Sequence, residues 1–475
     1  MADEFEVIVV GGGTAGLTAA LAARHEGASV ALVEREERIG GDCTFYGCVP
    51  SKALIEIAQT VFDARRLAAG GILESVPAPS FAQVAARRDA VVAEVARDER
   101  DERFTAAGIE IVRGRAQFSG EHELDVSGRA LRGRRFVIAT GSEPAVPPLP
   151  GLETVPFLSN RSVFALVELP RRLLVLGGGA IGLELAQAFH RLGSDVSVVE
   201  LLERLLPGEE PEAGELAAEV LHGEGVRLLL GAEARSVRRE GDEVVLETGA
   251  GTLRGDVLLV AAGRRGTAEQ LRLEEIGVRC EHGYVQIDEG CRTTARHVFA
   301  AGDVTGGLQF THVASHQGSV AGRNAAGGRA KRDERVVPWI TFLDPEIARV
   351  GLTETQARAR HRNVRIATYP MNRVDRARVA GRPAGFVKLV TRRRPLLGWA
   401  GGGELVGAQI VGPRAGELIQ ECALAMRTRA FAGRLTQTIH AYPAMSLAVQ
   451  QAAAQLFPLG RVLAERGENS GSPAD

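Results

Sequence analysis

The sequence predicts an α/β protein with two similar β-α-β units followed by an α+β domain, and three observations support this prediction. An apolar, β-branched run leads into a glycine-rich turn twice, at GGGTAG and at GGGAIG. At 475 residues, the chain is too long for one hydrophobic core. From about Val336 the sequence changes to WITFLDPEIARVGLT, which indicates a third domain.

Both β-α-β units have the same order of elements. In the first, the strand Phe5–Val10 precedes GGGTAG, the helical pattern LTAALAARHEG and the strand SVALVE. In the second, Leu173–Leu176 precedes GGGAIG, LELAQAFHRLG and DVSVVE. In each copy, a glutamate at the end of the second strand lies 23 residues after the first glycine of the turn. This repeated spacing predicts two Rossmann-like domains that each bind an adenine dinucleotide.

The three glycines of each GxGxxG turn have separate roles. The first allows the tight turn, the second lets the backbone approach a pyrophosphate, and the third permits close packing of helix on strand. They are Gly11, Gly13 and Gly16 in the first unit and Gly177, Gly179 and Gly182 in the second. A βαβ turn without a ligand is the alternative, but each turn here follows a strand, begins a helix and precedes a carboxylate.

The two glutamates predict how the dinucleotides are held. Glu34 and Glu200 are expected to accept hydrogen bonds from ribose hydroxyls, while the pyrophosphate faces the N-terminus of the helix after each turn. A carboxylate at Glu200 also repels the additional phosphate of NADPH, which favours NADH. The alternative is that Glu200 is only a charge at the end of a strand, and Arg204 nearby would soften the preference.

The composition argues against several kinds of partner. Lys and Arg number 57 against 59 Asp and Glu, so small molecules are expected as partners, and nucleic acid and membranes are not. The N-terminus MADEFEVIVVGGG lacks the basic region of a signal peptide, and no apolar run of about 18 residues is present. The five cysteines form neither a disulfide framework nor paired CxxC zinc motifs, so no metal site is predicted and a reducing cytoplasm is expected.

Two of the cysteines lie in the stretch GGDCTFYGCVPSK, residues 40–52. In a regular helix, residues five apart have Cα atoms about 9 Å apart, beyond the roughly 7 Å that a disulfide tolerates, so Cys43 and Cys48 require an irregular turn. Gly47 supplies the freedom for it, and the helical run that follows places both thiols near a helix N-terminus, which stabilises a thiolate. The stretch predicts reversible dithiol-disulfide chemistry, and two unrelated buried thiols are the alternative. We call residues 40–52 the redox segment.

The redox segment resembles that of the FAD-dependent pyridine nucleotide-disulfide oxidoreductases, the class I family that includes dihydrolipoamide dehydrogenase, glutathione reductase and mercuric reductase. RFVIATGSEP resembles the family's strand and glycine turn between the nucleotide domains, and RTTARHVFAAGDV resembles its second flavin motif. VPWITFLDPEIARVGLTETQA resembles the start of its dimerisation domain. The resemblance extends from Val7 to about Gln455.

This resemblance implies a domain organisation. An FAD-binding domain would comprise residues 1–150 and 281–335, an NAD(P)H-binding domain residues 151–280, and an α+β dimerisation domain residues 336–462. The dimerisation domain implies a homodimer. The polar end of the chain, residues 463–475, is expected to be disordered.

The resemblance also implies roles for individual residues. Hydride would pass from nicotinamide to flavin and electrons from flavin to the disulfide, with Cys48 facing the flavin and Cys43 attacking the substrate. Lys52 would lie beside flavin N5 and pair with Glu184, because a compact ammonium stabilises reduced, anionic flavin. Further positions that would contact FAD are Ala116, Gly141 and Asp303, and Gly263 would contact NAD.

The C-terminal motif departs from the family. Disulfide-reducing members have a sequence of the form HAHPTLSE, in which the second histidine is the acid-base catalyst and the glutamate orients it, whereas this chain has HAYPAMSLAVQ. Pro443 fixes the alignment, so Tyr442 and Leu447 occupy those positions. Tyr442 is the candidate catalytic residue there, but a tyrosine is a poor base at neutral pH, and losing a positioned base costs about 10² to 10⁴ in rate. His440 is expected to be structural.

The leading hypothesis is a cytoplasmic, homodimeric FAD flavoprotein that passes electrons from NADH through a Cys43–Cys48 disulfide to an unidentified small-molecule acceptor, like a mercuric reductase. Mercuric reductases also lack the histidine, but they carry a C-terminal cysteine pair. Here the last cysteine, Cys422, is expected in the core, and Cys280 and Cys291 in ordinary strand or loop positions. The alternatives are a dihydrolipoamide dehydrogenase, an NAD(P)H:quinone or other acceptor reductase, and a non-enzymatic flavin redox sensor.

Overall fold

The computed structural model describes residues 3–458, so the predicted disorder at residues 463–475 lies outside the described residues. The chain forms two units. The first comprises the chain up to Gly177 with Ala188–Ser197 and Ala234–Glu334, and the second comprises Gly178–Gln187, Val198–Glu233 and the chain from Arg335. Among the helices described, none is both long and apolar enough to cross a membrane.

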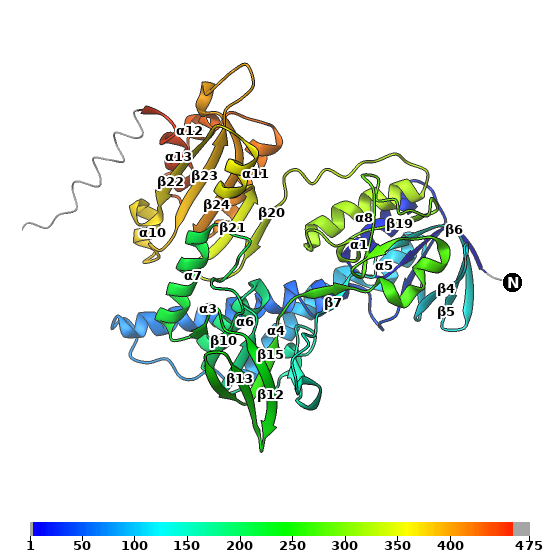
Figure 1. Cartoon of the computed structure of the whole chain (residues 1–475), viewed down its shortest axis with the longest axis horizontal. Helices are drawn as coiled ribbons and strands as arrows, with labels where there is room; N and C mark the ends of the chain where they lie inside the picture. The colour runs from blue at the N-terminus through cyan, green and yellow to red at the C-terminus, as the bar shows by residue number, and fades with distance from the viewer. Residues whose placement is uncertain (1–2, 459–475) are drawn as a thin grey trace, which may run out of the picture. The chain divides into compact units, whose positions relative to one another are not determined.

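A seven-stranded sheet is the centre of the first unit (Figure 1). Its strands are β1 (Asp3–Val10), β2 (Val30–Glu34), β3 (Ile109–Arg113), β4 (Ala116–Gly120), β5 (Glu123–Val126), β6 (Arg129–Ile138) and β19 (Val298–Ala300). The order is β3–β2–β1–β6–β5–β4, and β19 also pairs with β6. Strands β1, β2, β3, β6 and β19 run parallel to one another, as expected for a dinucleotide-binding sheet. The pairs β5–β6 and β4–β5 are antiparallel. The strands predicted from the first glycine motif are confirmed.

Strand β6 has two partners along one edge. Strand β5 pairs with its first residues, Arg129 to Arg132, and β19 pairs with its last three, Phe136 to Ile138. The change of partner occurs because the chain reaches this edge twice, once through the β4–β5 hairpin and once much later in the sequence.

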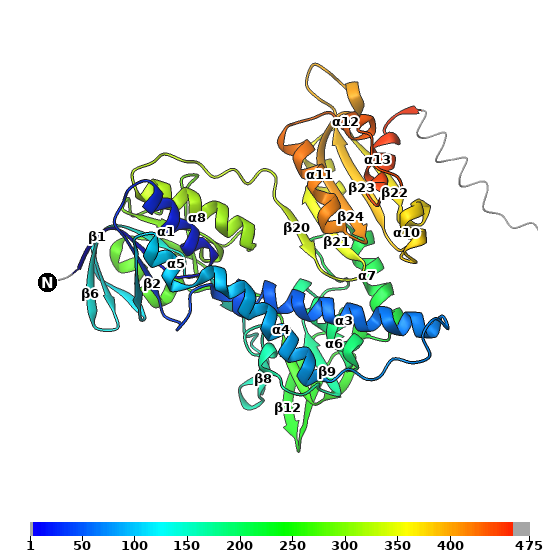
Figure 2. The ribbon, with the colours of Figure 1, turned by 180° about the vertical axis from the view of Figure 1, so that it is seen from behind.

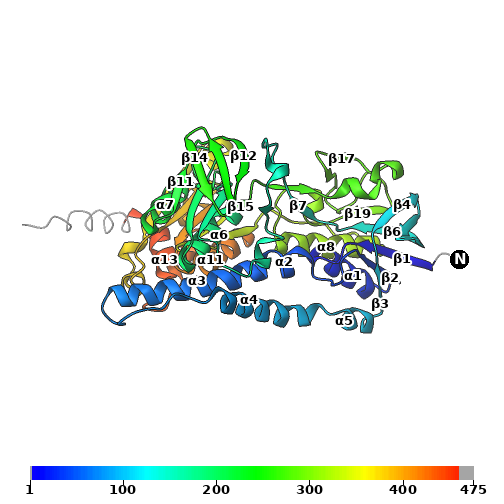
Figure 3. The ribbon, with the colours of Figure 1, turned by 90° about the horizontal axis from the view of Figure 1, so that it is seen from below.

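Helices α1 (Thr14–His25) and α8 (Thr311–Ala325) lie side by side next to this sheet (Figures 1 and 3). Gly318 and Gly322 of α8 face the backbone of α1 so closely that a Cβ on either would overlap a carbonyl oxygen, of Ala15 or Ala19. Both helices share one apolar core with the sheet, built largely of alanine and valine. This packing fixes the start of α8 close to the first glycine motif.

Two further helices of the first unit, α3 (Cys48–Ala69) and α4 (Phe81–Ala96), run side by side (Figure 3). They are followed by η1 (Arg97–Glu99) and α5 (Asp101–Ala106). The charged run RDERDER at 97–103 therefore spans two short helices. Such a charge run is usually a solvated helix face, and most of its side chains are exposed, but Glu99 is half-buried and hydrogen-bonds Thr44.

The second β-α-β unit contributes β9 (Arg172–Leu176), α6 (Ala180–Leu192) and β10 (Asp195–Val199), which confirms the elements predicted there. With β8 (Phe157–Leu158), β11 (Arg227–Leu229) and β15 (Val257–Val260) these strands form a sheet of order β11–β10–β9–β15–β8. An antiparallel sheet follows, of β12 (Ala234–Glu240), β13 (Glu243–Thr248) and β14 (Gly251–Gly255). Two short pairs complete the strands, β7 (Ser142–Pro144) with β16 (Arg264–Gly266) and β17 (Cys280–Glu281) with β18 (Tyr284–Val285).

The C-terminal part of the second unit is an antiparallel sheet with helices packed on it (Figure 2). Its order is β20 (Pro338–Thr341), β21 (Glu346–Gly351), β24 (Glu404–Gly412), β23 (Phe386–Arg392) and β22 (Val364–Pro370). The helices of this unit are α7 (Pro211–Glu224), α9 (Glu354–Arg360), α10 (Asp375–Val379), α11 (Ala415–Arg427), α12 (Gly433–Gln437) and α13 (Leu447–Ala454). The predicted α+β architecture is confirmed, and Cys422 is fully buried on α11 in its core.

Candidate active site

The first glycine turn connects β1 to α1. Gly11 has a φ of +107°, and a Cβ there would overlap the carbonyl of the residue after β6. A Cβ on Gly16 would overlap the Gly11 carbonyl oxygen. Beside the turn, the Gly12 amide donates to Glu34 Oε2 over 2.6 Å, and the Glu34 side chain is buried at the end of β2. Gly11 and Gly16 therefore lie where a side chain would collide with neighbouring backbone, and the turn binds the Glu34 carboxylate through the Gly12 amide.

The redox segment begins directly on this turn. The Gly40 amide donates to the Gly12 carbonyl over 2.8 Å, and Gly40 forms an isolated bridge with Gly13. Gly41 has a φ of +66°, and a Cβ there would lie 2.7 Å from Gly13 Cα. Glycine on both sides lets the two backbones approach, so the predicted dinucleotide turn and the predicted dithiol are parts of one site.

The irregular turn predicted between the two cysteines is confirmed. Cys43 lies in the five-residue helix α2 (Gly41–Phe45), which ends before Tyr46, and Cys48 is the first residue of α3. Gly47 between them has φ −135° and ψ −111°, and a Cβ there would lie 2.9 Å from the Asp42 carbonyl oxygen. The break brings Cys43 back toward Cys48 and places Cys48 at the N-terminus of a 22-residue helix.

A threonine contacts both sulfur atoms. Thr311, the first residue of α8, donates its hydroxyl to Cys43 Sγ over 3.3 Å, and its Oγ1 lies 3.4 Å from Cys48 Sγ. The two thiols also hydrogen-bond each other, and this bond together with burial raises the pKa of the Cys43 thiol. Sequence reasoning missed Thr311; the only local signal is a hydroxyl residue at the start of a helix, which is common.

Glu99 also belongs to this site. Thr44, inside the redox segment, donates its hydroxyl to Glu99 Oε2 over 2.6 Å, and the Glu99 carboxylate is close enough to disfavour a thiolate at Cys43. Burial raises the pKa of the Glu99 carboxyl. The residue was missed because nothing in RDERDER distinguishes it from its neighbours.

Asp303, predicted to contact FAD, lies in a polar network next to the redox segment. Its Oδ2 accepts a hydrogen bond from the Ser142 hydroxyl over 2.7 Å, and Ser142 Oγ accepts one from Arg264 Nε over 2.7 Å. Arg264 also donates to Asp42 Oδ2 over 2.7 Å, and Arg161 donates to Asp42 Oδ1 over 2.6 Å. The network holds Asp42, the residue next to Cys43, between two guanidinium groups. The sequence had indicated Asp303 but not its partners.

Three other predicted positions in the first unit are turns or strand ends. Gly141 and Gly263 have φ values of +74° and +126°, and a Cβ on either would have no neighbouring atom within 4 Å. Ala116 is half-buried at the start of β4, next to an apolar cluster. Their contacts with FAD and NAD remain predictions.

Lys52 and Glu184, the pair predicted to lie beside the flavin, are both at least half-buried. Glu184 is buried on α6, and its Oε1 accepts a hydrogen bond from the Phe342 amide over 2.8 Å. Lys52 is half-buried in the first turn of α3, four residues after Cys48. The pairing of Lys52 with Glu184 remains a prediction.

The second glycine turn repeats the geometry of the first. Gly177 has a φ of +117°, and a Cβ there would overlap a carbonyl after β15. The Gly178 amide donates to Glu200 Oε2 over 2.6 Å, and Glu200 Oε1 accepts from the Leu202 amide over 2.8 Å. A Cβ on Gly179 would have no neighbouring atom within 4 Å. Gly182 lies within α6.

Both turns fit an adenine dinucleotide. In each, a glycine turn leads directly into a helix, and the helix N-terminus attracts a pyrophosphate. In each, an ordered carboxylate lies where the ribose of a dinucleotide is recognised.

The C-terminal motif offers no histidine base at the predicted position. Tyr442 is exposed and donates its hydroxyl to Asp375 Oδ2 over 3.1 Å, which raises the pKa of the phenol. His440 has both ring nitrogens next to acceptors: Nδ1 lies 2.9 Å from the Thr438 carbonyl and Nε2 3.1 Å from Glu421 Oε1. These contacts fit the structural role predicted for His440.

Comparison with known families identifies the chain. The model of the pyridine nucleotide-disulphide oxidoreductases matches residues 5–318, and the model of their dimerisation domain matches residues 337–453. The chain belongs to this family. It is an NAD(P)H-dependent flavin disulfide oxidoreductase that uses FAD and NAD(P)H as cofactors.

Relatives with different activities resemble the chain to a similar degree. A mercuric reductase of Staphylococcus aureus is 34% identical over 456 residues, covering 95% of this chain and 82% of the relative. A dihydrolipoyl dehydrogenase of Thermus scotoductus is 37% identical over 462 residues, covering 95% and 97%.

Two solved structures share the fold at full length. The HOCl-induced flavoprotein disulfide reductase RclA of Escherichia coli has 29% identity and a TM-score of 0.84, covering 94% of this chain and 99% of that one. LpdA of Mycobacterium tuberculosis has 29% identity and a TM-score of 0.85, covering 96% and 100%.

Proposed function

We propose that this oxidoreductase uses NADH to reduce a Cys43–Cys48 disulfide and passes the two electrons to a thiophilic metal ion, as a mercuric reductase does. The observation that carries the proposal is the combination of a complete dithiol site with an exposed, protonated tyrosine where disulfide-reducing members of the family have a histidine base. A thiophilic cation binds thiolates directly, so it requires no residue that protonates or deprotonates a substrate thiol.

The cofactors would be held by the two glycine turns. FAD would be held at the first turn by the α1 N-terminus and Glu34, with Ala116, Gly141 and Asp303 as further contacts. NADH would be held at the second turn, with Glu200 disfavouring the additional phosphate of NADPH and Gly263 as a further contact. When bound, FAD carries two electrons from NADH to the disulfide.

The chain's own residues would divide the work at the sulfurs. Because the pKa of the Cys43 thiol is raised, Cys43 keeps its proton and shares it in a hydrogen bond with Cys48. The Cys48 sulfur would then carry the negative charge and would face the flavin when FAD is bound. Thr311 would hold the two sulfur atoms close to each other, because its hydroxyl contacts both. Lys52, paired with Glu184, would stabilise the negative charge of the reduced flavin.

The reaction balances in two halves. NADH, one proton and the disulfide give NAD⁺ and two thiols. Two thiols and a divalent ion such as Hg²⁺ then give the disulfide, two protons to solvent and the reduced metal. Delivery of the ion cannot use Cys422 in its native position, because that thiol is fully buried.

The family's dimerisation domain supports a homodimer as the working form. The predicted domain limits, with residues 1–150 and 281–335 binding FAD, 151–280 binding NADH and 336–462 forming the dimer, belong to the same proposal. Sedimentation analysis of the FAD-loaded protein tests it, and a monomer at assay concentration would contradict the dimer.

The test of function is an anaerobic NADH titration of the FAD-loaded enzyme, followed by an acceptor screen with Hg²⁺, quinones and dihydrolipoamide. A long-wavelength thiolate-flavin band should appear, persist in Cys43→Ser and vanish in Cys48→Ser, while Hg²⁺-dependent NADH oxidation is lost in both. Quinone turnover that survives in both variants would instead support a quinone reductase. Flavin reduction with no steady consumption of any acceptor would support a redox sensor.

The tyrosine has its own test. Tyr442→His combined with Leu447→Glu should raise dihydrolipoamide turnover by about 10² to 10⁴, the usual contribution of a positioned acid-base group. Tyr442→Phe is the matched control and should leave metal-ion reduction little changed. Family-level dihydrolipoamide turnover by the unaltered enzyme would contradict the proposal.

A further inference from the structure

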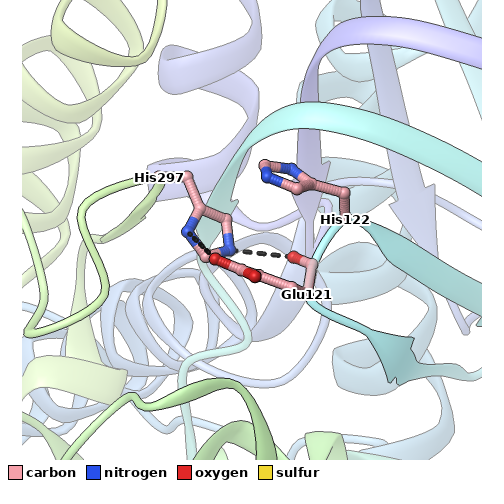
Figure 4. A group of neighbouring side chains, drawn as sticks. All are labelled: Glu121, His122 and His297. Carbon is pink, nitrogen blue, oxygen red and sulfur yellow. Dashed lines mark hydrogen bonds and ion pairs between the residues drawn. The ribbon is translucent and has the colours of Figure 1, made fainter.

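Glu121, His122 and His297 form a cluster in the first unit that the reaction does not use (Figure 4). Glu121 and His122 lie in the turn between β4 and β5, and His297 immediately precedes β19. The three side chains each offer a ligand atom, and these atoms all lie within 4.8 Å of one another. Figure 4 shows the His122 ring directed toward His297 and the Glu121 carboxylate beside the His297 ring.

The backbone brings the two histidines together. The Gly133 amide donates to the His122 carbonyl over 3.0 Å, and the Phe136 amide donates to the His297 carbonyl over 2.9 Å. These two amides are three residues apart on β6, where β5 ends its pairing and β19 begins. Both histidines are thus fixed to the same strand, at the point where it changes partner, and their ring centroids lie 4.6 Å apart.

The hydrogen bonds of the rings determine which nitrogens are available. His122 Nδ1 lies 2.9 Å from the Gly133 carbonyl, which can only accept, so Nδ1 carries the proton and Nε2 has the lone pair. His297 Nε2 lies 2.8 Å from the Glu121 backbone carbonyl, so Nδ1 has the lone pair. That nitrogen faces Glu121 Oε1 at 3.9 Å.

This is the arrangement that metal-binding histidines have in proteins. One ring nitrogen donates to a backbone carbonyl, which fixes the tautomer and the ring orientation, and the other nitrogen binds the ion. A metal ion requires the neutral form of each histidine, with a lone pair on the free ring nitrogen.

The donor set and its dimensions fit zinc. Two imidazoles and one carboxylate form a common Zn²⁺ site, with a water as the fourth ligand, and bonds of about 2.0 to 2.2 Å separate tetrahedral ligand atoms by roughly 3.3 Å. The present spacing must close by about 1.5 Å. Glu121 can supply most of that movement, because 73% of its side chain is exposed, whereas His297 is held with 14% exposed.

We propose that Glu121, His122 and His297 bind a divalent cation of the Zn²⁺ class, which fastens the β4–β5 turn to the segment before β19. The ion would link the two segments that pair with β6 on either side of the gap between β5 and β19. It would thereby stabilise this edge of the sheet in the first unit. The sequence gives no sign of this site, because the two histidines are 175 residues apart and match no ligand spacing.

The experiment uses FAD-loaded enzyme carrying Cys43→Ser and Cys48→Ser, so that the catalytic thiols do not bind the probe. Titration with Zn²⁺ alone, followed by calorimetry, should show one ion bound per chain. His122→Ala and Glu121→Gln should each weaken binding by about 100-fold, and His25→Ala, an exposed histidine on α1 in the same unit, should leave it unchanged.

Two readouts distinguish a metal site from a structural cluster. Zn²⁺ should raise the melting temperature of the parent but not of Glu121→Gln, whose exposed side chain contributes little to folding without metal. X-ray absorption at the zinc edge should show only nitrogen and oxygen ligands. Equal Zn²⁺ affinity in the parent and all three variants, or sulfur among the ligands of the bound zinc, would overturn the proposal, and neither result depends on the reaction the enzyme catalyses.

Discussion

The two glycine turns of this chain are nearly the same at the carboxylate and different at the second glycine. Glu34 and Glu200 each accept a glycine amide over 2.6 Å, at corresponding positions of the two turns. At the second glycine, however, Gly13 lies against Gly40 and Gly41 of the redox segment, while a Cβ on Gly179 would have no neighbouring atom within 4 Å. The redox segment therefore covers the second glycine of the first turn, whereas the second glycine of the other turn has open space beside it.

The difference suits the ligands that we propose for the two turns, FAD at the first and NADH at the second. A dinucleotide held at a covered turn exchanges only if the covering segment moves, which suits a cofactor that stays bound through many turnovers. A dinucleotide at an open turn can leave after each turnover, as NADH must. The segment that covers the first turn also carries Cys43 and Cys48, so the proposed function would combine cofactor binding and electron transfer in one place.

The largest effect is expected from Gly16→Ala. The new Cβ would overlap the Gly11 carbonyl oxygen, and both partners are backbone, so the first turn must distort. We expect loss of bound flavin, measured as the ratio of flavin to protein absorbance in the purified protein. Gly179→Ala is the matched control at the open turn and should retain its flavin with only a small rise in the KM for NADH. Equal flavin content in the two variants would remove the distinction between the turns.

Gly41→Ala tests the cover itself. A Cβ at Gly41 would press on Gly13 Cα, and alanine is also strained at a φ of +66°. The redox segment should lift from the turn, weakening FAD by about 10- to 100-fold, equivalent to roughly 1.4 to 2.7 kcal/mol. Fluorescence titration of the apoprotein with FAD measures this. Unchanged affinity together with normal thiol chemistry would show that the contact does not hold the cofactor.

The pH dependence should differ between the two half-reactions. The pKa of the Cys43 thiol is raised, so below it the thiolate fraction grows about tenfold per pH unit and the rate of acceptor reduction should rise with it. Reduction of the oxidised enzyme by NADH does not need the Cys43 thiolate and should change less between about pH 6 and 9. Stopped-flow measurement of each half-reaction separates them. Parallel profiles would mean that Cys43 is not the attacking sulfur.

The smallest effect is expected at the second carboxylate. Glu200→Gln removes the charge that repels a 2′-phosphate, and the ratio of KM for NADPH to KM for NADH should fall by about tenfold, or roughly 1.4 kcal/mol. Glu34→Gln is the matched control, because it should weaken FAD while leaving the nicotinamide preference unchanged. A shift in preference from Glu34→Gln, or none from Glu200→Gln, would contradict the assignment of the two turns.

The sequence by itself determined both β-α-β units, the glycine turns with their glutamates, and the break between Cys43 and Cys48. These features depend on hydrophobic period, glycine conformation and helix geometry over about 30 residues, which are all local. It also indicated Asp303, through a motif. The dinucleotide turns and the dithiol therefore follow from short stretches of sequence without knowledge of how distant elements pack.

The tertiary structure alone decided what surrounds them. Thr311 lies 268 residues from Cys43 in the sequence and reaches it because α8 packs on α1 through glycine contacts. Glu99 faces the redox segment although its charged neighbours face solvent, and His122 meets His297 because β6 changes partner between them. The physical reason is the same in each case. A single polar side chain produces no periodic pattern in the sequence, so only the packing of distant elements determines which residues it contacts.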